Sequence, residues 1–168
     1  MGAAGIIAPD ERVELIDGEL YTMTPPSSQH AGHVKWLAKQ LERAYGDDVI
    51  VSTQDPLTLD KHRLLEPDLA LLRPKDSFYI DAHPTAEDTF LAIEVSLSSL
   101  MFDKERKLPR YAEAGVPELW IVDVERGQTE IYQEPFGNSY RHRLLVQRGE
   151  KVAPRAFSET EVIVFPPV

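Results

Sequence analysis

The sequence predicts a mixed α/β (α+β) fold, in which a central mixed β-sheet is flanked by two main helices and extended by further antiparallel strands. Three observations predict it. Apolar residues recur at helical spacing in residues 29–45, strand-like apolar runs fill much of residues 49–96, and a second helical stretch over residues 100–114 precedes more strand-like runs. We expect the 168 residues to form a single domain with its own core, and residues 1–10 to be flexible.

The first two elements are a hairpin and a helix. In "RVELIDGELYTMT" (12–24), apolar and polar residues alternate on both sides of an Asp-Gly pair, which favours a two-residue hairpin turn. The helix over residues 29–45 has a candidate N-cap in Ser27 or Ser28, and Gly46 is expected to end it.

Four strand-like runs follow in the middle of the chain, at residues 49–53, 56–60, 67–72 and 89–96. The second helix, expected over residues 100–114, contains Pro109 and is followed by Gly115, a typical helix terminator. Four more strands are expected beyond it, at residues 118–123, 129–134, 140–147 and 161–165.

The composition limits the chemistry that the chain can use. There is no cysteine, which excludes disulfides, thiolate metal sites and thiol nucleophiles. The apolar N-terminal stretch lacks the basic start of a signal peptide, and no apolar run approaches the roughly 20 residues that span a bilayer. We therefore expect a cytoplasmic protein without a membrane partner.

The formal net charge of −10 is uneven, since residues 1–100 carry −9 and residues 101–168 carry −1. An acidic protein does not attract nucleic acid through its overall field. A nucleic-acid partner therefore requires a local basic surface, or metal ions that neutralise clustered carboxylates. The best local candidate is the basic segment "YRHRLLVQRGEK" (140–151), with a solvated hairpin as the simpler interpretation.

A carboxylate interrupts the most apolar of the expected strands. In "TFLAIEVS" (89–96), the pleat sends Leu91, Ile93 and Val95 to one face and Glu94 to the other. A buried carboxylate is costly without a cation, a metal ion or a proton, so Glu94 is a candidate site residue. A glutamate at the solvated end of a half-exposed strand is the alternative.

Asp68 opens another apolar strand, in "EPDLALL" (66–72). A Glu-Pro-Asp turn before a strand is the ordinary interpretation of this pattern. Two acids on neighbouring strands, however, can converge on a hard divalent cation such as Mg²⁺. Asp68 and Glu94 are therefore the candidate metal ligands.

The segment "DKERK" (103–107) supplies nearby cations. Asp103 and Lys107 are four residues apart, which favours a surface ion pair on a solvated helix face. A lysine beside a metal-bound water can instead orient the nucleophile and stabilise the charge that develops on a phosphate.

An Asp, a Glu and a Lys on consecutive strands and a following helix resemble the PD-(D/E)XK nuclease superfamily. More narrowly, the chain resembles the large bacterial Uma-two family of restriction-endonuclease-like proteins. The segments that carry the resemblance are "VELIDGEL" (13–20), "PPSSQH" (25–30), "EPDLALL" (66–72), "IEVSLSS" (93–99), "DKERKLPRYAEAGVPELWIVD" (103–123) and the strand-rich C-terminus. The resemblance covers nearly the whole chain and implies a restriction-endonuclease-like fold.

The resemblance implies that Asp68 and Glu94 bind the metal and that a lysine completes the catalytic site. The superfamily pattern places this lysine two residues after Glu94, where the chain has Ser96, so the lysine is expected on the next helix instead. The spacing Asp-x-x-x-Lys-x-x-x-Tyr selects Lys107. On a regular helical wheel Lys104 lies nearer to the apolar stripe, and it stays the alternative.

Two further residues match the family pattern or lie near the expected site. Glu14, in "VELIDGEL", is a candidate additional metal ligand or outer acid, with an exposed hairpin glutamate as the alternative. His30 is a candidate general base or supporting group, with a structural histidine on an apolar helix face as the alternative. Tyr111, at helical spacing, is expected to belong to the core.

These residues predict a Mg²⁺-dependent (or Mn²⁺-dependent) endonuclease that hydrolyses phosphodiester bonds. DNA is the expected partner. The resemblance also implies a homodimer, because nucleases of this type often work as dimers to cut both strands. The alternative is a catalytically inactive nuclease fold retained as a binding or scaffolding module. Metal-free hydrolysis by two carboxylates, as in glycosidases, is less favoured because the sequence places no sugar-binding aromatic cluster near these acids.

Overall fold

The computed structural model describes residue 8 and residues 10–167, so most of the segment expected to be flexible, residues 1–10, lies outside the described residues. The helices are α1 (Ser28–Tyr45), α2 (Leu100–Phe102), the π-helical segment η4 (Asp103–Lys107) and α3 (Leu108–Ala114), with 3-10 turns η2 (Gly46–Asp48), η3 (Ala86–Asp88) and η5 (Arg155–Phe157). The strands are β1 (Val13–Ile16), β2 (Glu19–Thr22), β3 (Ile50–Thr53), β4 (Leu57–Asp60), β5 (Arg63–Leu65), β6 (Leu69–Leu72), β7 (Thr89–Ser96), β8 (Glu118–Asp123), β9 (Gln128–Phe136), β10 (Ser139–Gln147), β11 (Lys151–Val152) and β12 (Val162–Ile163). None of the described helices combines the length and apolarity that crossing a membrane requires.

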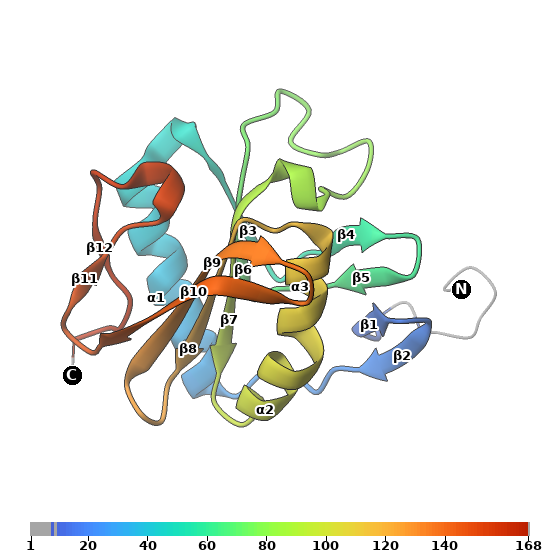
Figure 1. The fold of residues 1–168 in the computed structure, drawn as a ribbon, viewed down its shortest axis with the longest axis horizontal. Coiled ribbons are helices and arrows are strands. Elements are labelled where there is room, and N and C mark those ends of the chain that lie inside the picture. Colours follow the sequence, from blue (N-terminus) through green and yellow to red (C-terminus); the bar gives the residue numbers. More distant parts are fainter. Residues whose placement is uncertain (1–7, 9, 168) are drawn as a thin grey trace.

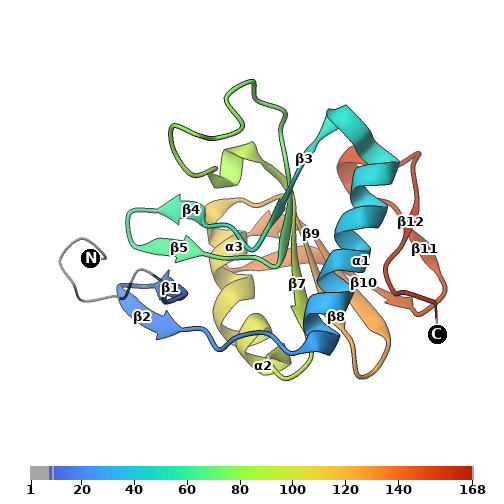
Figure 2. The ribbon, with the colours of Figure 1, turned by 180° about the vertical axis from the view of Figure 1, so that it is seen from behind.

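A six-stranded sheet runs through the centre of the molecule in the order β10-β9-β8-β7-β6-β3. Strands β7 and β8 are parallel and the other neighbours are antiparallel, which confirms the predicted mixed sheet. Parallel neighbours need a long crossover, and the continuous segment α2–η4–α3 supplies it. Helix α1 covers one face of the sheet and α3 covers the other (Figure 1, Figure 2).

The two faces of β7 are buried in two different clusters. Leu91, Ile93 and Val95 pack into the cluster that includes the apolar stripe of α1. Ala92 packs into the cluster that includes α3. The alternation predicted for this strand is confirmed, and it turns Glu94 toward the face that the crossover covers.

A second, four-stranded sheet has the order β2-β1-β5-β4 and contains the predicted N-terminal hairpin. Asp17 and Gly18 have φ angles of 52° and 82°, as the turn type favoured by an Asp-Gly pair requires. Strand β5, which the sequence pattern did not predict, pairs with β1. The Glu66 amide donates to Glu14 Oε1 (2.8 Å) and ties β1 to the segment that leads into β6.

The second predicted helix is present but is not regular. The Leu108 amide bonds to the carbonyl of Asp103, five residues back, which is the π-helical pattern. Pro109 follows directly and has no amide hydrogen to restore the α-helical pattern. The wider turn brings Asp103 and Lys107 to the same inward side, and both are buried. The solvated surface pair considered for these two residues is therefore wrong.

Candidate active site

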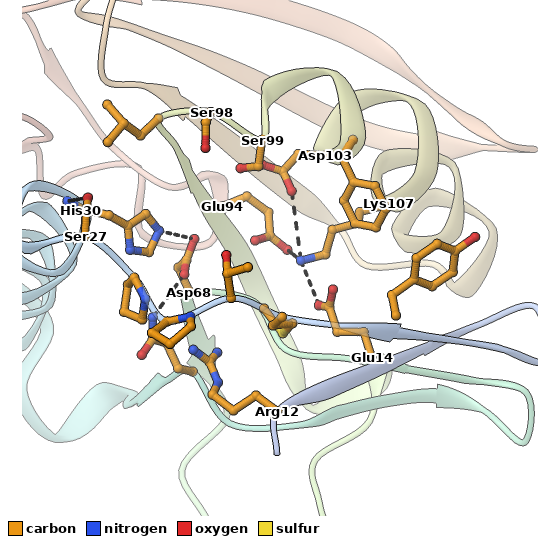
Figure 3. Close-up of a pocket in the computed structure, with 18 of the residues that line it drawn as sticks. Arg12, Glu14, Ser27, His30, Asp68, Glu94, Ser98, Ser99, Asp103 and Lys107 are labelled. Carbon is orange, nitrogen blue, oxygen red and sulfur yellow. Dashed lines mark hydrogen bonds and ion pairs between the residues drawn. The ribbon is translucent and has the colours of Figure 1, made fainter. Parts of the chain in front are cut away.

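A pocket of about 450 Å³ lies between the N-terminal hairpin, the start of α1 and the crossover that follows β7. It is lined by five residues that the sequence singled out as site candidates, Glu14, His30, Asp68, Glu94 and Lys107, but not by the alternative lysine, Lys104. Figure 3 shows their side chains directed toward a common space from separate elements of the fold. The fold therefore brings together residues that are distant in the sequence.

Lys107 lies at the centre of a buried cluster of charges. Its Nζ is 2.7 Å from Glu94 Oε1, 2.8 Å from Glu14 Oε1 and 4.0 Å from Asp103 Oδ1 (Figure 3). Glu14, Glu94 and Lys107 are only 2%, 3% and 3% exposed, so the alternatives that placed these acids in solvent are wrong. Burial favours the neutral amine, but the carboxylates of Glu94 and Glu14 raise the pKa of Lys107, which stays charged.

The carboxylate of Glu94 is shared between two donors. Its Oε1 accepts a hydrogen bond from the Tyr111 hydroxyl (2.6 Å) in addition to the ion pair with Lys107. Burial raises the pKa of the Glu94 carboxyl well above its usual range, and the Lys107 ammonium opposes this rise. Burial also raises the pKa of Tyr111, so its hydroxyl remains a donor. Tyr111 is buried as expected, but its polar end belongs to the site.

Asp68 lies next to Glu94 at the point where β6 begins. The antiparallel pairing of Leu69 with Ile93 sets this position, because the next pair outward along the two strands is Asp68 and Glu94. The Val95 amide donates to Asp68 Oδ2 (2.8 Å), which fixes the carboxylate against the end of β7. The two candidate metal ligands are therefore neighbours.

His30 reaches Asp68 from the first turn of α1. Its Nε2 lies 3.2 Å from Asp68 Oδ2, and the N-cap Ser27 accepts the His30 amide (3.2 Å). The hydrogen bond to Asp68 raises the pKa of His30. Burial disfavours the charged form of Asp68, but the bond from His30 holds its pKa below the ordinary value. Nδ1 of His30 is buried and has no partner among the described residues.

Ser96 occupies the position where the superfamily pattern has its lysine, and it anchors the crossover instead. Its hydroxyl donates to Asp103 Oδ2 (2.6 Å), which also accepts from Ser99 (2.9 Å). Burial raises the pKa of Asp103, and these two donors favour its charged form. The bonds hold η4 against the end of β7, from where Lys107 reaches Glu94.

Lys104 points away from the pocket. Its Nζ pairs with Glu130 Oε1 (2.9 Å), and 37% of its side chain is exposed. A regular helix would have turned Lys104 toward the apolar stripe, but the π-helical turn directs Lys107 inward. The geometry favours Lys107 as the candidate catalytic lysine, and its catalytic function stays a prediction.

The basic segment 140–151 does not contribute to the lining of this pocket. Most of it lies on β10, where Arg143 pairs with Glu130 (3.2 Å) and His142 pairs with Glu134 (3.3 Å). Arg143 therefore compensates a neighbouring acid.

The ion pairs of Glu130 predict a specific dependence of stability on pH. Burial opposes ionisation, but hydrogen bonds from Arg143, Tyr132 and Lys104 lower the pKa of Glu130 from 4.5 to about 2. A carboxyl group whose pKa is lower in the folded state stabilises the protein at pH values above its pKa in the unfolded state. This contribution is lost as the pH falls through its pKa in the folded state. We expect Glu130→Gln to be less stable than the wild type at neutral pH, with the difference shrinking between about pH 4.5 and pH 2. Urea unfolding at several pH values measures this difference, and a constant difference would contradict the assignment.

Sequence reasoning did not assign a site function to three residues that contact the candidates: Asp103, Tyr111 and Gln54. The amide of Gln54 donates to Asp68 Oδ1 (3.3 Å). The signal for the first two was present, because the spacing Asp-x-x-x-Lys-x-x-x-Tyr that selected Lys107 begins at Asp103 and ends at Tyr111. Gln54 follows β3 and has no comparable signal.

A mixed sheet that brings an Asp and a Glu from adjacent strands beside a buried lysine defines the class of restriction-endonuclease-like proteins. The family model described as "Putative restriction endonuclease" (Uma2, or Uma-two) matches residues 4–164, and the chain belongs to this family.

A solved structure supports the same fold. The chain is similar to the crystal structure of a "putative nuclease belonging to DUF820" from Anabaena variabilis, with a TM-score of 0.72 and 12% sequence identity over 96% of this chain and 92% of that one. No curated protein matches the chain. At this identity the likeness shows the fold alone.

Proposed function

We propose that the chain is a Mg²⁺-dependent endonuclease, also able to use Mn²⁺, that hydrolyses phosphodiester bonds in DNA. The observation that supports this best is the 2.7 Å contact between Lys107 Nζ and Glu94 Oε1 in a pocket that Asp68 also lines. It provides a cation for a phosphate beside two candidate metal ligands.

Asp68 and Glu94 suit a hard divalent ion. Within residue 8 and residues 10–167, no three His, Asp or Glu side chains form a complete metal cage. Mg²⁺, however, keeps several waters and commonly binds through one or two carboxylates and the phosphate of its substrate. Glu94 Oε2 accepts no hydrogen bond from the described residues, and Asp68 Oδ1 accepts only the long one from Gln54 (3.3 Å). One oxygen of each carboxylate is therefore available, and the donor set fits Mg²⁺.

A divalent ion held by these carboxylates would supply an activated water and neutralise charge on the phosphate. Lys107 keeps its proton, so its ammonium can hold a phosphate oxygen or orient the attacking water. Tyr111 fixes the Glu94 carboxylate by donating its hydroxyl to Oε1.

Glu14 and His30 support these groups. Glu14 pairs with Lys107 and limits the positions that the ammonium can take. His30 orients Asp68 through Nε2 and is the candidate general base or supporting group at the site.

A binding or scaffolding module is the second candidate, and one observation favours it. Lys107 already pairs with Glu94, and His30 already pairs with Asp68, so both candidate metal ligands have partners within the protein. Calorimetric titration with Mn²⁺ separates the two functions. No heat of binding at millimolar metal would favour the module.

The nuclease proposal predicts cleavage that depends on a divalent ion. We expect the purified chain to cut DNA in Mg²⁺ or Mn²⁺, to lose activity in excess chelator, and to recover it when metal is restored. Glu94→Gln, purified in parallel, controls for contaminating nucleases because it removes a proposed metal ligand while keeping the shape of the side chain. Equal cleavage by both proteins, or none in any metal, would reject the proposal. The homodimer and the cytoplasmic location stay predictions, which light scattering and cell fractionation would test.

A further inference from the structure

The charged groups of the candidate site are buried at the bottom of a small pocket. Glu14, Asp68, Glu94 and Lys107 are all buried, yet each lines the pocket of about 450 Å³. This volume is typical of sites for small ligands, which span about 300–1,000 Å³. A phosphodiester must enter the pocket to reach Lys107, and the neighbouring nucleotides must bend to follow it. A single strand bends readily, whereas a duplex is stiff over about 150 base pairs.

The charged residues of the pocket are poorly suited to binding the phosphate backbone of a duplex. Its described lining residues include four carboxylates and only two Lys or Arg side chains, Arg12 and Lys107. Arg12 is engaged by Glu66, with Nε and Nη2 at 3.0 Å and 2.9 Å from Oε2. Duplex binding depends largely on Lys and Arg side chains that neutralise phosphates, and this chain has a net charge of −10. Affinity must therefore come from another kind of contact.

Apolar and aromatic side chains form a second part of the lining. Tyr21 of β2 and Phe102 of α2 both line the pocket, with ring centroids 5.5 Å apart and ring planes at 62°. Both are only partly buried, and Tyr21 directs its hydroxyl to Glu19 (2.9 Å). The segment 23–27 joins β2 to α1 (Figure 2). It adds Met23 and two prolines to the pocket lining. Bases stack on aromatic rings whatever their sequence, because every base has a π-face, and the stacking contact itself does not involve the charge of the phosphate.

We infer that the site takes single-stranded nucleic acid, with a base against Tyr21 and Phe102 and its phosphate directed toward Lys107. Intact duplex is excluded from the buried groups. This inference rests on the proposed function, because it names the substrate class of the same site. It also reconciles the site with the acidic charge of the chain, since stacking replaces phosphate neutralisation as the main source of affinity.

The test compares binding and cleavage of two substrates. Fluorescence anisotropy in Ca²⁺ measures binding of a labelled oligothymidylate, which forms no duplex with itself, and of a labelled duplex of equal length. We expect the single strand to bind at least about 10-fold more tightly. We also expect a weak dependence on salt, because the pocket lining offers only two Lys or Arg side chains to neutralise phosphates. Phe102→Leu and Tyr21→Leu keep apolar bulk and are expected to weaken single-strand binding by about 5-fold or more. Phe136→Leu, which changes an exposed ring outside the pocket, is expected to have no effect.

Each outcome bears on the inference separately from the proposed function. Equal binding of duplex and single strand, or equal cleavage of both in Mg²⁺, would overturn the inference and leave the nuclease in place. Selective binding of single strands that depends on Tyr21 and Phe102, without cleavage in any metal, would support the inferred ligand and reject the nuclease. The third outcome is that Phe102→Leu and Tyr21→Leu are folded, as melting curves would show, and still prefer single strands as strongly as the wild type. This outcome would show that the two rings do not stack on a base, and it would overturn the inference.

Discussion

Lys107→Met is expected to abolish metal-dependent cleavage and to lower the free energy of unfolding by about 3–5 kcal/mol, as breaking a buried ion pair commonly does. Methionine keeps most of the aliphatic stem but removes the ammonium that lies 2.7 Å from Glu94 and 2.8 Å from Glu14. Both carboxylates are then buried without their counter-charge. The loss of stability should shrink as the pH falls, because burial raises the pKa of the Glu94 carboxyl and protonation then neutralises it. Urea unfolding at neutral and acidic pH, with a cleavage assay on the folded variant, measures both effects.

The matched control is Lys104→Met, which makes the same change three residues earlier. Lys104 is partly exposed and pairs with Glu130 outside the pocket, so we expect a loss of at most about 1 kcal/mol and unchanged cleavage. The reverse result, with cleavage lost in Lys104→Met and kept in Lys107→Met, would mean that the wrong lysine has been chosen.

Local patterns in the sequence were sufficient to predict most of the central fold. The alternation in residues 89–96 predicted which face of β7 carries Glu94, and both clusters confirm it. The Asp-Gly pair predicted the first hairpin, because few other residues adopt its positive φ angles. Strand β5 was missed, since three residues are too short to show a period, and its pairing with β1 is a long-range contact.

The sequence predicted the candidate site less completely than it predicted the fold. Glu14 could not be distinguished from an exposed hairpin residue, because its burial depends on β5 and on the Glu66 amide, which are distant in the sequence. Lys107 and Lys104 could not be separated on a regular helical wheel, since the wheel assumes an α-helix and the chain forms a π-helical turn before Pro109. The aromatic pair was missed because Tyr21 and Phe102 belong to elements that only the tertiary fold brings together.

The buried acids of the site also suggest why the chain tolerates an unfavourable cluster. Glu14, Glu94 and Asp103 surround a single lysine, and burial raises the pKa values of Glu94 and Asp103. Such a cluster costs stability, since buried charges lose hydration and like charges repel. Proteins commonly accept this cost at a functional site, where the groups must be ready for a charged ligand. A divalent ion near Asp68 and Glu94 would relieve part of the repulsion.

A divalent metal ion is therefore expected to stabilise the wild type against unfolding. We expect Asp68→Asn to abolish this stabilisation and to reduce cleavage strongly. At a Mn²⁺ concentration about 100-fold above Kd, a ligand that binds only the folded state adds about 2.7 kcal/mol to the free energy of unfolding. Asparagine keeps an oxygen for the Val95 amide, which donates to Asp68 at 2.8 Å, so the fold should persist. It removes the negative charge that a divalent ion requires. We expect cleavage to fall by about 100-fold or more, because even contacts outside the metal's own ligands commonly contribute 10- to 100-fold.

Thermal unfolding with and without Mn²⁺, followed by a cleavage assay, measures both effects in the same preparations. Asp55→Asn is the matched control, since Asp55 is exposed, lies outside the pocket and accepts a hydrogen bond from Ser52. This control should keep the metal-dependent rise in Tm and full cleavage. If Asp68→Asn keeps the same rise as the wild type, the metal binds elsewhere, and Asp68 serves only to hold His30 and the end of β7 in place.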